Sequence, residues 1–348
     1  MKQIKHIPIT QDILNAIAEF DEFKGAWLLY GKLTPDRRAN LQRVALAQTI
    51  TQSMFADGYQ VSESQVMRVL NRLNADSFDM MQEQLIAGYA FASKELQAHY
   101  AHMPFSQASI QQLHRWLSRY LKNGSMDAGR YKQRPNHVMS PGGDGSISCV
   151  IAQTALPYET ESEMDDLVYV TVDALNARHL HPLQVIAHFV GRFLHIQPFQ
   201  DHNHALLQLV MQQLLLQQGY QFMPYGAIGA LHTDIEILYT ALRRAYHDSS
   251  AHEQVACGWM RLFMRTLLDH KRKLQEKVAR EQTLNLHVSD YAATVLGLIQ
   301  EHGKLSLSDL VRLTGFNKHT TKKHVQELVK KQQVIMHGKA RATWYTIL

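Results

Sequence analysis

A short polar stretch between two apolar segments carries the residue types most suited to chemistry in this chain. Residues 201–204 read DHNH, and residues 197–200 before them read QPFQ. Apolar residues recur at helical spacing over 183–194, and an almost continuous apolar run follows from 206 to 216. Asp201 and Asn203 are natural caps for the second helix, whose free backbone N–H groups attract negative charge. The pattern predicts a helix, a polar loop and a buried helix that together hold an anionic ligand.

The frame around this stretch resembles the core of the Fic (Fido) family. The family signature is HPFx(D/E)GNGRxxR, and the likeness extends over about residues 10–275, with matches at His181-Pro182, Ala187-His188, Phe193, Ile196, Pro198-Phe199, Asp201 and Asn203. The resemblance implies a mainly α-helical bundle with a small β-hairpin flap. It also implies the family activity, which is transfer of AMP from Mg²⁺-bound ATP to a protein hydroxyl.

The position of the catalytic base departs from that signature. Gln197 stands where the family has the histidine that takes the proton from the target hydroxyl. An amide does not titrate near neutral pH, so general-base catalysis, typically a factor of about 10²–10⁴ in rate, is lost. The sequence therefore predicts a degenerate base position and an inactivated AMP-transferase, that is, a pseudoenzyme.

The phosphate-binding positions are changed as well. The resemblance implies a nucleotide loop made of Phe199, His202, His204, Ala205 and Gln208. Here two histidines replace glycines, which costs about 1 kcal/mol where positive φ is needed, and alanine and glutamine replace the arginines that clamp phosphate. Asp201, which holds Mg²⁺ in the family, and Asn203 are kept. ATP and Mg²⁺ are thus the cofactors that the family implies, and the substitutions weigh against them.

Two other interpretations of the histidines stay open. His195 or His204 would serve as a substitute base in a weak protein adenylyltransferase. His195, however, would lie roughly 200° around the helix from position 197 and point elsewhere. The set His188, His195, His202, His204 and Asp201 also fits a transition-metal site by ligand type, although histidine is frequent throughout this chain.

An upstream helix end resembles the inhibitory motif of the same family, (S/T)xxx(E/N)G. Residues 53–58 read SMFADG, so Ser53, Asp57 and Gly58 take the motif positions. In the family the acidic residue pairs with the second signature arginine and excludes the γ-phosphate. Asp57 is one methylene shorter than glutamate, and Gln208 stands at the arginine position, so that ion pair is not expected. The alternative is an ordinary helix end with Gly58 as its stop.

Residues 134–157 carry the pattern of a β-hairpin. The turn GGDG at 142–145 separates His137-Val138-Met139 from an apolar strand over 147–152. In the family the corresponding flap binds a target peptide by strand addition, so the hairpin at 138–152 is a candidate docking edge for a peptide or protein partner. An ordinary surface hairpin is the other interpretation. A peptide-binding interaction module is therefore an alternative function.

The C-terminal residues 286–348 show three short amphipathic helices followed by a second hairpin. Ser306 caps the second helix, the turn at 315–317 starts the third, and Gly338 lies in the hairpin turn. This order resembles a winged helix-turn-helix, a class that commonly binds paired DNA half-sites as a dimer. Side chains suited to phosphates and base edges are Lys318, His319, Thr320, Thr321, Lys322, Lys323, Lys339 and Arg341. DNA binding is the favoured role, and a solvated lysine face or a protein contact is the alternative.

The composition indicates an ordinary globular protein. Of the 348 residues, 45% are hydrophobic and 19% are charged, with a formal net charge of +5. Only Cys149 and Cys257 are present, so no disulfide framework is expected. The first residues lack the apolar core of a signal peptide and no segment has the length of a membrane span, so the expected location is cytoplasmic.

These patterns divide the chain into three parts. Residues 1–100 form an N-terminal helical region with the inhibitory-helix-like segment, 101–275 the Fic (Fido) core and 276–348 the winged helix-turn-helix domain. The sequence as a whole predicts a mainly α-helical protein with an inactivated transferase site that acts as a DNA-associated regulator.

Overall fold

The computed structural model describes residues 4, 9–27, 35–73, 78–122, 127–141, 147–227, 238–242, 252–287, 290–338 and 343–347. The chain divides into two compact units, Met1–Leu274 and Gln275–Leu348. Helix α11 (His252–His287) begins in the first unit and ends in the second. Among the described helices, none combines the length and apolar character needed to cross a bilayer.

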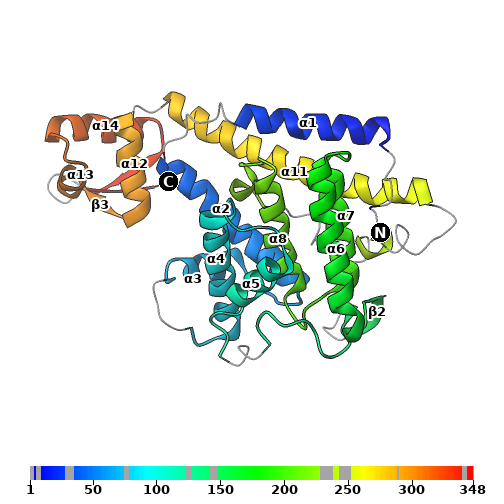
Figure 1. The fold of residues 1–348 in the computed structure, drawn as a ribbon. Helices are drawn as coiled ribbons and strands as arrows, with labels where there is room; N and C mark the ends of the chain where they lie inside the picture. Colours follow the sequence, from blue (N-terminus) through cyan, green and yellow to red (C-terminus); the bar gives the residue numbers. More distant parts are fainter. Residues whose placement is uncertain are drawn as a thin grey trace. The chain divides into compact units, whose positions relative to one another are not determined.

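The first unit is mainly helical, as predicted (Figure 1). Besides the start of α11, its described elements are α1 (Gln11–Trp27), α2 (Pro35–Ala56), α3 (Glu63–Leu70), α4 (Met81–His99), α5 (Gln107–Leu117), β1 (His137–Pro141), β2 (Ile147–Gln153), α6 (Pro157–Ala177), α7 (Pro182–Ile196), α8 (Asn203–Gln217) and the short 3₁₀ helix η2 (Met223–Tyr225).

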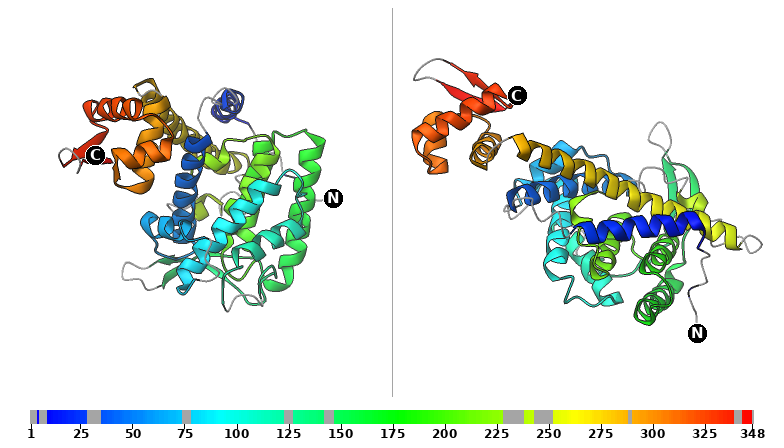
Figure 2. Two further views of the ribbon diagram at one scale, coloured as in Figure 1. Left: turned by 90° about the vertical axis from the view of Figure 1, so that its left-hand side faces the viewer. Right: turned by 90° about the horizontal axis from the view of Figure 1, so that it is seen from above.

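Helix α8 forms the centre of this unit. Its sequence is apolar on nearly every side, and nearly all of its residues are buried, because α2, α4, α5 and α7 pack around it. On the outside, α1 lies alongside the first part of α11 (Figure 2). Two ion pairs join them, Arg261–Asp12 at 2.5 Å and Lys271–Glu19 at 2.7 Å.

Helix α2 ends in a tight turn that fixes the segment after it. The N–H of Tyr59 donates to the carbonyl of Met54 at 2.7 Å, and the N–H of Gly58 donates to that of Phe55 at 3.0 Å. Gly58 has φ 88°, so this is the Schellman arrangement with glycine in the left-handed position. The turn places Asp57 directly after the last residue of the helix, and its side chain accepts hydrogen bonds from α8.

Strands β1 and β2 pair antiparallel and confirm the two strands expected over 137–152. Val138 pairs with Ala152 and Met139 with Val150, and the register shifts between these pairs. The expected turn at 142–145 lies outside the described residues.

The second unit contains α12 (Asp290–His302), β3 (Leu305–Ser306), α13 (Leu307–Thr314), α14 (Lys318–Lys330), β4 (Val334–His337) and β5 (Trp344–Ile347). The strands form an antiparallel sheet in the order β3-β5-β4, of which β3 was not expected from the sequence. Ser306 caps α13 and Asn317 caps α14, and Gly315 takes the left-handed conformation between them. One apolar core joins all three helices to the sheet, with Val295, Leu310, Leu328 and Tyr345 among its members.

Candidate active site

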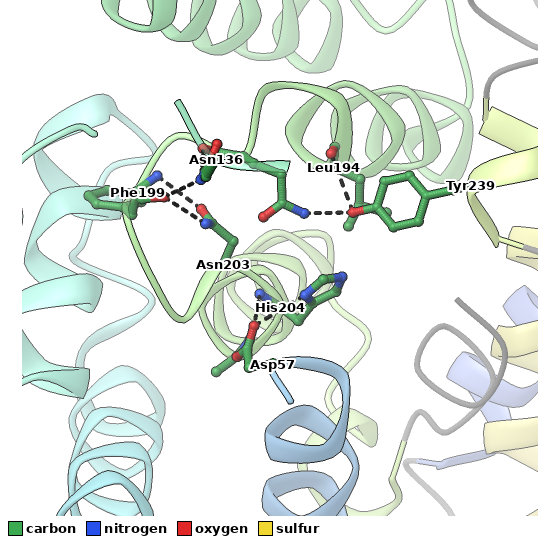
Figure 3. A network of polar contacts seen from close by, with 9 residues as sticks. Asp57, Asn136, Leu194, Phe199, Asn203, His204 and Tyr239 are labelled. Atoms are coloured by element: carbon green, nitrogen blue, oxygen red, sulfur yellow. Dashed lines mark hydrogen bonds and ion pairs between the residues drawn. The ribbon is translucent and has the colours of Figure 1, made fainter. Parts of the chain in front are cut away.

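Helix α7 ends at the residue that replaces the family base. Gln197 adopts a left-handed conformation (φ 48°, ψ 65°), and its N–H donates to the carbonyl of Phe193 at 2.8 Å. Its side chain is buried, and Nε2 donates to the hydroxyl of Tyr239 at 2.6 Å (Figure 3). Burial raises the pKa of Tyr239 well above its ordinary value, so the phenol stays protonated. Both partners are neutral at physiological pH, and neither supplies a base at this position.

Asn203 closes the loop and does not cap the helix. Its Oδ1 accepts from the N–H of Phe199 at 3.0 Å, and its Nδ2 donates to the carbonyl of Phe199 at 2.8 Å (Figure 3). The cap position belongs to His202, whose side chain makes no capping bond, and Asp201 is exposed. The prediction that Asp201 and Asn203 cap α8 is therefore wrong, because the loop itself uses the asparagine side chain.

The ring of Phe199 anchors the loop to α5. It stacks on His114 with ring centroids 4.1 Å apart and planes 10° from parallel. Nδ1 of His114 accepts from the N–H of Gly129 at 2.9 Å, and burial lowers the pKa of His114 to about 3. The imidazole is thus neutral and serves as a packing surface. Phe199 is fully buried and has no open face for a nucleotide.

Two residues ahead of the hairpin hold the backbone of the loop. Nζ of Lys132 donates to the carbonyl of residue 196 at 2.7 Å, and the backbone N–H of Lys132 donates to the carbonyl of residue 198 at 2.9 Å. Asn136 donates to those of residues 197 and 199, at 3.3 and 2.9 Å. Every carbonyl from 196 to 199 is therefore hydrogen-bonded. Sequence reasoning did not find Lys132 or Asn136, because a lysine and an asparagine four residues apart ahead of a strand form no recognisable motif.

The two histidines at the glycine positions differ in backbone conformation. His202 has φ 61° and ψ 25°, the left-handed conformation that glycine adopts without strain, and its ring lies 6.0 Å from that of Tyr59. His204 lies in the first turn of α8 and has no positive φ. The strain expected from replacing glycine therefore falls on His202 alone.

A carboxylate from another helix closes the N-terminus of α8. Oδ1 of Asp57 accepts from the N–H of His204 at 3.1 Å, and Oδ2 accepts from the N–H of Ala205 at 3.1 Å. The imidazole Nδ1 of His204 is also 3.1 Å from Oδ1 (Figure 3). Helix N-termini bind anions in this way, and here the anion is part of the protein. No ion pair between Asp57 and position 208 was expected from the sequence, and the structure instead pairs Asp57 with His204.

The charge of Asp57 is stabilised although its side chain is only 8% exposed. Burial by itself would raise the pKa of this carboxyl. The hydrogen bond and charge of His204, the charge of His202 and the N–H of Ala205 outweigh that effect and hold the pKa below its ordinary value. Asp57 is therefore ionised at neutral pH, in a position suited to negative charge.

The space beside this carboxylate is small. The cavity that Asp57 lines together with Tyr59, His202 and Ala205 has a volume of about 10 Å³, enough for about one water molecule. Positions 205 and 208 are buried and carry no cation. In this arrangement the residues do not fit a triphosphate with Mg²⁺. The described residues also contain no group of three or more histidine, cysteine or acidic side chains placed to hold a metal ion.

The residues expected to bind DNA lie in α14 and in the second hairpin. Lys318, His319, Lys322 and Lys323 are exposed, and Thr320 is half-buried. Thr321 is fully buried, and its hydroxyl donates to the carbonyl of Asn317 at 3.1 Å. The assignment of Thr321 to the exposed face is therefore wrong, because this threonine belongs to the core side of the helix. Lys339 and Arg341 lie outside the described residues.

Comparison with known proteins agrees with the fold. Residues 104–215 match the Fic/DOC family model, and residues 277–343 match a family of bacterial proteins of unknown function. No curated protein matches the chain significantly. A Fic family protein from Desulfovibrio desulfuricans G20 is similar over 98% of this chain and 97% of its own, with 20% identity and a TM-score of 0.61.

Two further solved structures are similar in fold over part of this chain. A Fic domain containing signalling protein from Bacteroides thetaiotaomicron is similar over 74% of this chain and 95% of its own, at 17% identity and a TM-score of 0.56. A fragment of Fic-1 from C. elegans is similar over 78% of this chain and 74% of its own, at 14% identity and a TM-score of 0.52. The chain thus has a Fic fold. Residues 104–215 are a Fic/DOC domain by their match to the family model.

Proposed function

We propose that this protein is a Fic-fold regulator that does not transfer nucleotides and that binds DNA through its second unit. The observation that supports a closed transferase site is the carboxylate of Asp57 on the N–H groups of residues 204 and 205. A phosphate group and a carboxylate compete for the same donors at a helix N-terminus, so a bound Asp57 excludes the anion. In addition, the side-chain amide of Gln197, which is hydrogen-bonded to Tyr239, is not a general base.

The charge distribution supports DNA binding. Residues 275–348 contain eleven Lys and Arg against six Asp and Glu, so this segment accounts for the whole formal net charge of +5. The described exposed basic residues include Lys318, Lys322 and Lys323 at the start of α14. In a winged helix-turn-helix, the third helix enters the major groove with its N-terminal residues, and a helix start with this charge is suited to phosphates and base edges.

The DNA proposal is tested by fluorescence anisotropy with short random-sequence duplexes over a range of salt concentrations. We expect binding that weakens steeply with salt, because each neutralised phosphate releases counterions. Lys322→Gln and Lys323→Gln should each lower the salt slope by about 1. Lys122→Gln is the matched control, since Lys122 is an exposed lysine of the first unit, 60% exposed and paired with Asp79. Absence of binding at low salt would rule out the proposal.

A weak nucleotide transferase is the second candidate, and one contact favours it. The 3.1 Å contact between Asp57 and His204 is a carboxylate–imidazole pair, the arrangement that orients a histidine base in acid–base enzymes. Incubation with labelled ATP and Mg²⁺ separates the two candidates. A closed site predicts no label on the protein itself or on added lysate proteins. Label that disappears in both Asp201→Ala and His204→Gln would establish the transferase instead.

A further inference from the structure

Both ends of the β1–β2 hairpin are tied together by one buried lysine. Asn136 lies directly before β1 and Thr154 directly after β2. Nζ of Lys132 donates to Oδ1 of Asn136 at 2.9 Å and to Oγ1 of Thr154 at 3.0 Å. The hydroxyl of Thr154 in turn donates to the backbone carbonyl of Asn136 at 2.5 Å. A hydrogen-bond network around the ammonium group of Lys132 therefore joins the two ends of the hairpin.

The third bond of this ammonium group leads out of the hairpin. Nζ of Lys132 donates to the carbonyl of Ile196 at 2.7 Å, so its three donors meet three neutral oxygens. The residue is 4% exposed, and burial lowers the pKa of Lys132 to about 8. Removing the head group would leave one buried acceptor, the carbonyl of Ile196, and two half-buried acceptors without this donor, which is the costly way to lose a hydrogen bond. The position of the hairpin on the loop 196–199 thus depends on this head group together with the side chain of Asn136, which donates to the carbonyls of residues 197 and 199.

The same loop is connected to the closed end of α8. The carbonyl of Phe199 accepts from Asn136 at 2.9 Å and from Asn203 at 2.8 Å (Figure 3). Asn203 is the first residue of α8, and the next two residues donate to Asp57. Hydrogen bonds therefore connect the ends of the hairpin to Asn203, and the backbone of the first turn of α8 connects Asn203 to the two residues that donate to Asp57.

We propose that Lys132 couples the hairpin to Asp57, so that displacement of the hairpin and withdrawal of Asp57 from α8 favour one another. Lys132 is a positioning residue, because its effect on Asp57 is transmitted through the loop 196–199. Coupling between two sites is reciprocal, so each change must promote the other by the same factor. The proposal rests on observed contacts of the first unit and is independent of DNA binding.

Hydrogen exchange of the full chain, followed by mass spectrometry, tests the coupling. Lys132→Met keeps the aliphatic stem and removes the head group, whereas Lys132→Arg keeps a cation. We expect Lys132→Met to speed exchange of the β1 and β2 amides and of the amides of residues 204 and 205 by about tenfold or more, and Lys132→Arg to have a smaller effect. Lys24→Met is the matched control, since Nζ of Lys24 donates to the carbonyl of Gln218 at 2.7 Å in the same unit. It should leave both regions unchanged.

The reciprocal measurement starts from the other end of the network. Asp57→Ala should speed exchange in β1 and β2 by a factor similar to that which Lys132→Met produces at residues 204 and 205. If Lys132→Met affects the hairpin alone, or Asp57→Ala affects the start of α8 alone, the two sites are not coupled and the proposal is wrong. The Asp57→Ala arm decides the question by itself if Lys132→Met fails to fold.

Discussion

Oδ1 of Asp57 and Nδ1 of His204 lie 3.1 Å apart, although 147 positions separate the two residues in the chain. The histidine replaces a family glycine and the aspartate replaces a family glutamate, and each substitution alone looks like the loss of a function. Together they form a contact that also satisfies two backbone N–H groups of α8. The altered positions therefore close the helix end by a contact different from the acid–arginine pair of the family motif.

Asp57→Ala should lower the free energy of unfolding by about 1–3 kcal/mol, because two N–H groups at a helix start and a buried imidazole lose their acceptor. Asp57→Asn keeps the shape and one acceptor oxygen, and it should cost less. Urea unfolding of the three proteins at neutral pH measures both differences. Equal stability of all three would mean that water replaces the carboxylate without cost.

The contribution of Asp57 should also depend on pH. Its pKa lies below the ordinary value of 3.8 in the folded protein, so the stabilisation is fully present above that value. It is lost as the pH falls through the lowered folded-state pKa, because the carboxyl must then be protonated. The difference in unfolding free energy between the unmodified protein and Asp57→Asn should therefore shrink on acidification. A difference that does not change with pH would show that the charge of Asp57 contributes nothing.

His202→Gly should stabilise the protein by about 0.5–1 kcal/mol. The left-handed backbone at φ 61° is strained for histidine and relaxed for glycine, and the higher entropy of glycine in the unfolded chain offsets part of the gain. His204→Gly is the contrasting variant, since this position is helical and bonded to Asp57, and it should destabilise. Thermal and urea unfolding of both variants checks the opposite signs.

Gly58→Ala should destabilise by about 1 kcal/mol through backbone strain alone. Gly58 has φ 88°, and a Cβ placed there would meet no atom within 4 Å. Gly25→Ala is the matched control, because Gly25 also has open space but lies in the helical backbone of α1, where alanine should stabilise by about 0.5–1 kcal/mol. Denaturant unfolding of the two variants separates strain from packing.

The free energy of unfolding should also depend on pH in the alkaline range, because of Lys132. Its pKa falls from 10.5 to about 8 on folding, so the folded protein releases this proton earlier than the unfolded chain. The contribution of Lys132 to the free energy of unfolding therefore rises between about pH 8 and 10.5, by at most about 1.4 kcal/mol per pH unit. This gain is lost as the pH falls back through about 8, where the folded protein takes up the proton again. Subtracting the pH profile of Lys132→Met isolates the effect. A flat difference over this range would contradict the lowered pKa.

The sequence predicted the elements around the site because they are encoded locally. The apolar pattern over 206–216 gives the buried helix α8, Ser306 caps α13 as expected, and the two strands of the first hairpin form at the expected segments. Each of these depends on neighbours within a few residues.

The contacts that close the site were not predictable in this way. Asp57 and His204, Gln197 and Tyr239, and Lys132 and Ile196 are pairs separated by at least 42 positions, and no spacing rule connects them. Thr321 shows the limit within one helix, because the polar hydroxyl suggested an exposed position whereas its bond to the carbonyl of Asn317 makes burial acceptable. Tertiary packing decided these cases.

The capping of α8 by Asp57 has a consequence for the order in which the chain folds. The first turn of α8 has no side-chain cap from its own segment, so it gains one only after a loop of 147 residues has closed. Closing so long a loop costs entropy before any contact compensates for it. The middle of α8 is therefore expected to form ahead of its first turn, and the anion-binding end of the helix should be among the last parts of the first unit to become ordered.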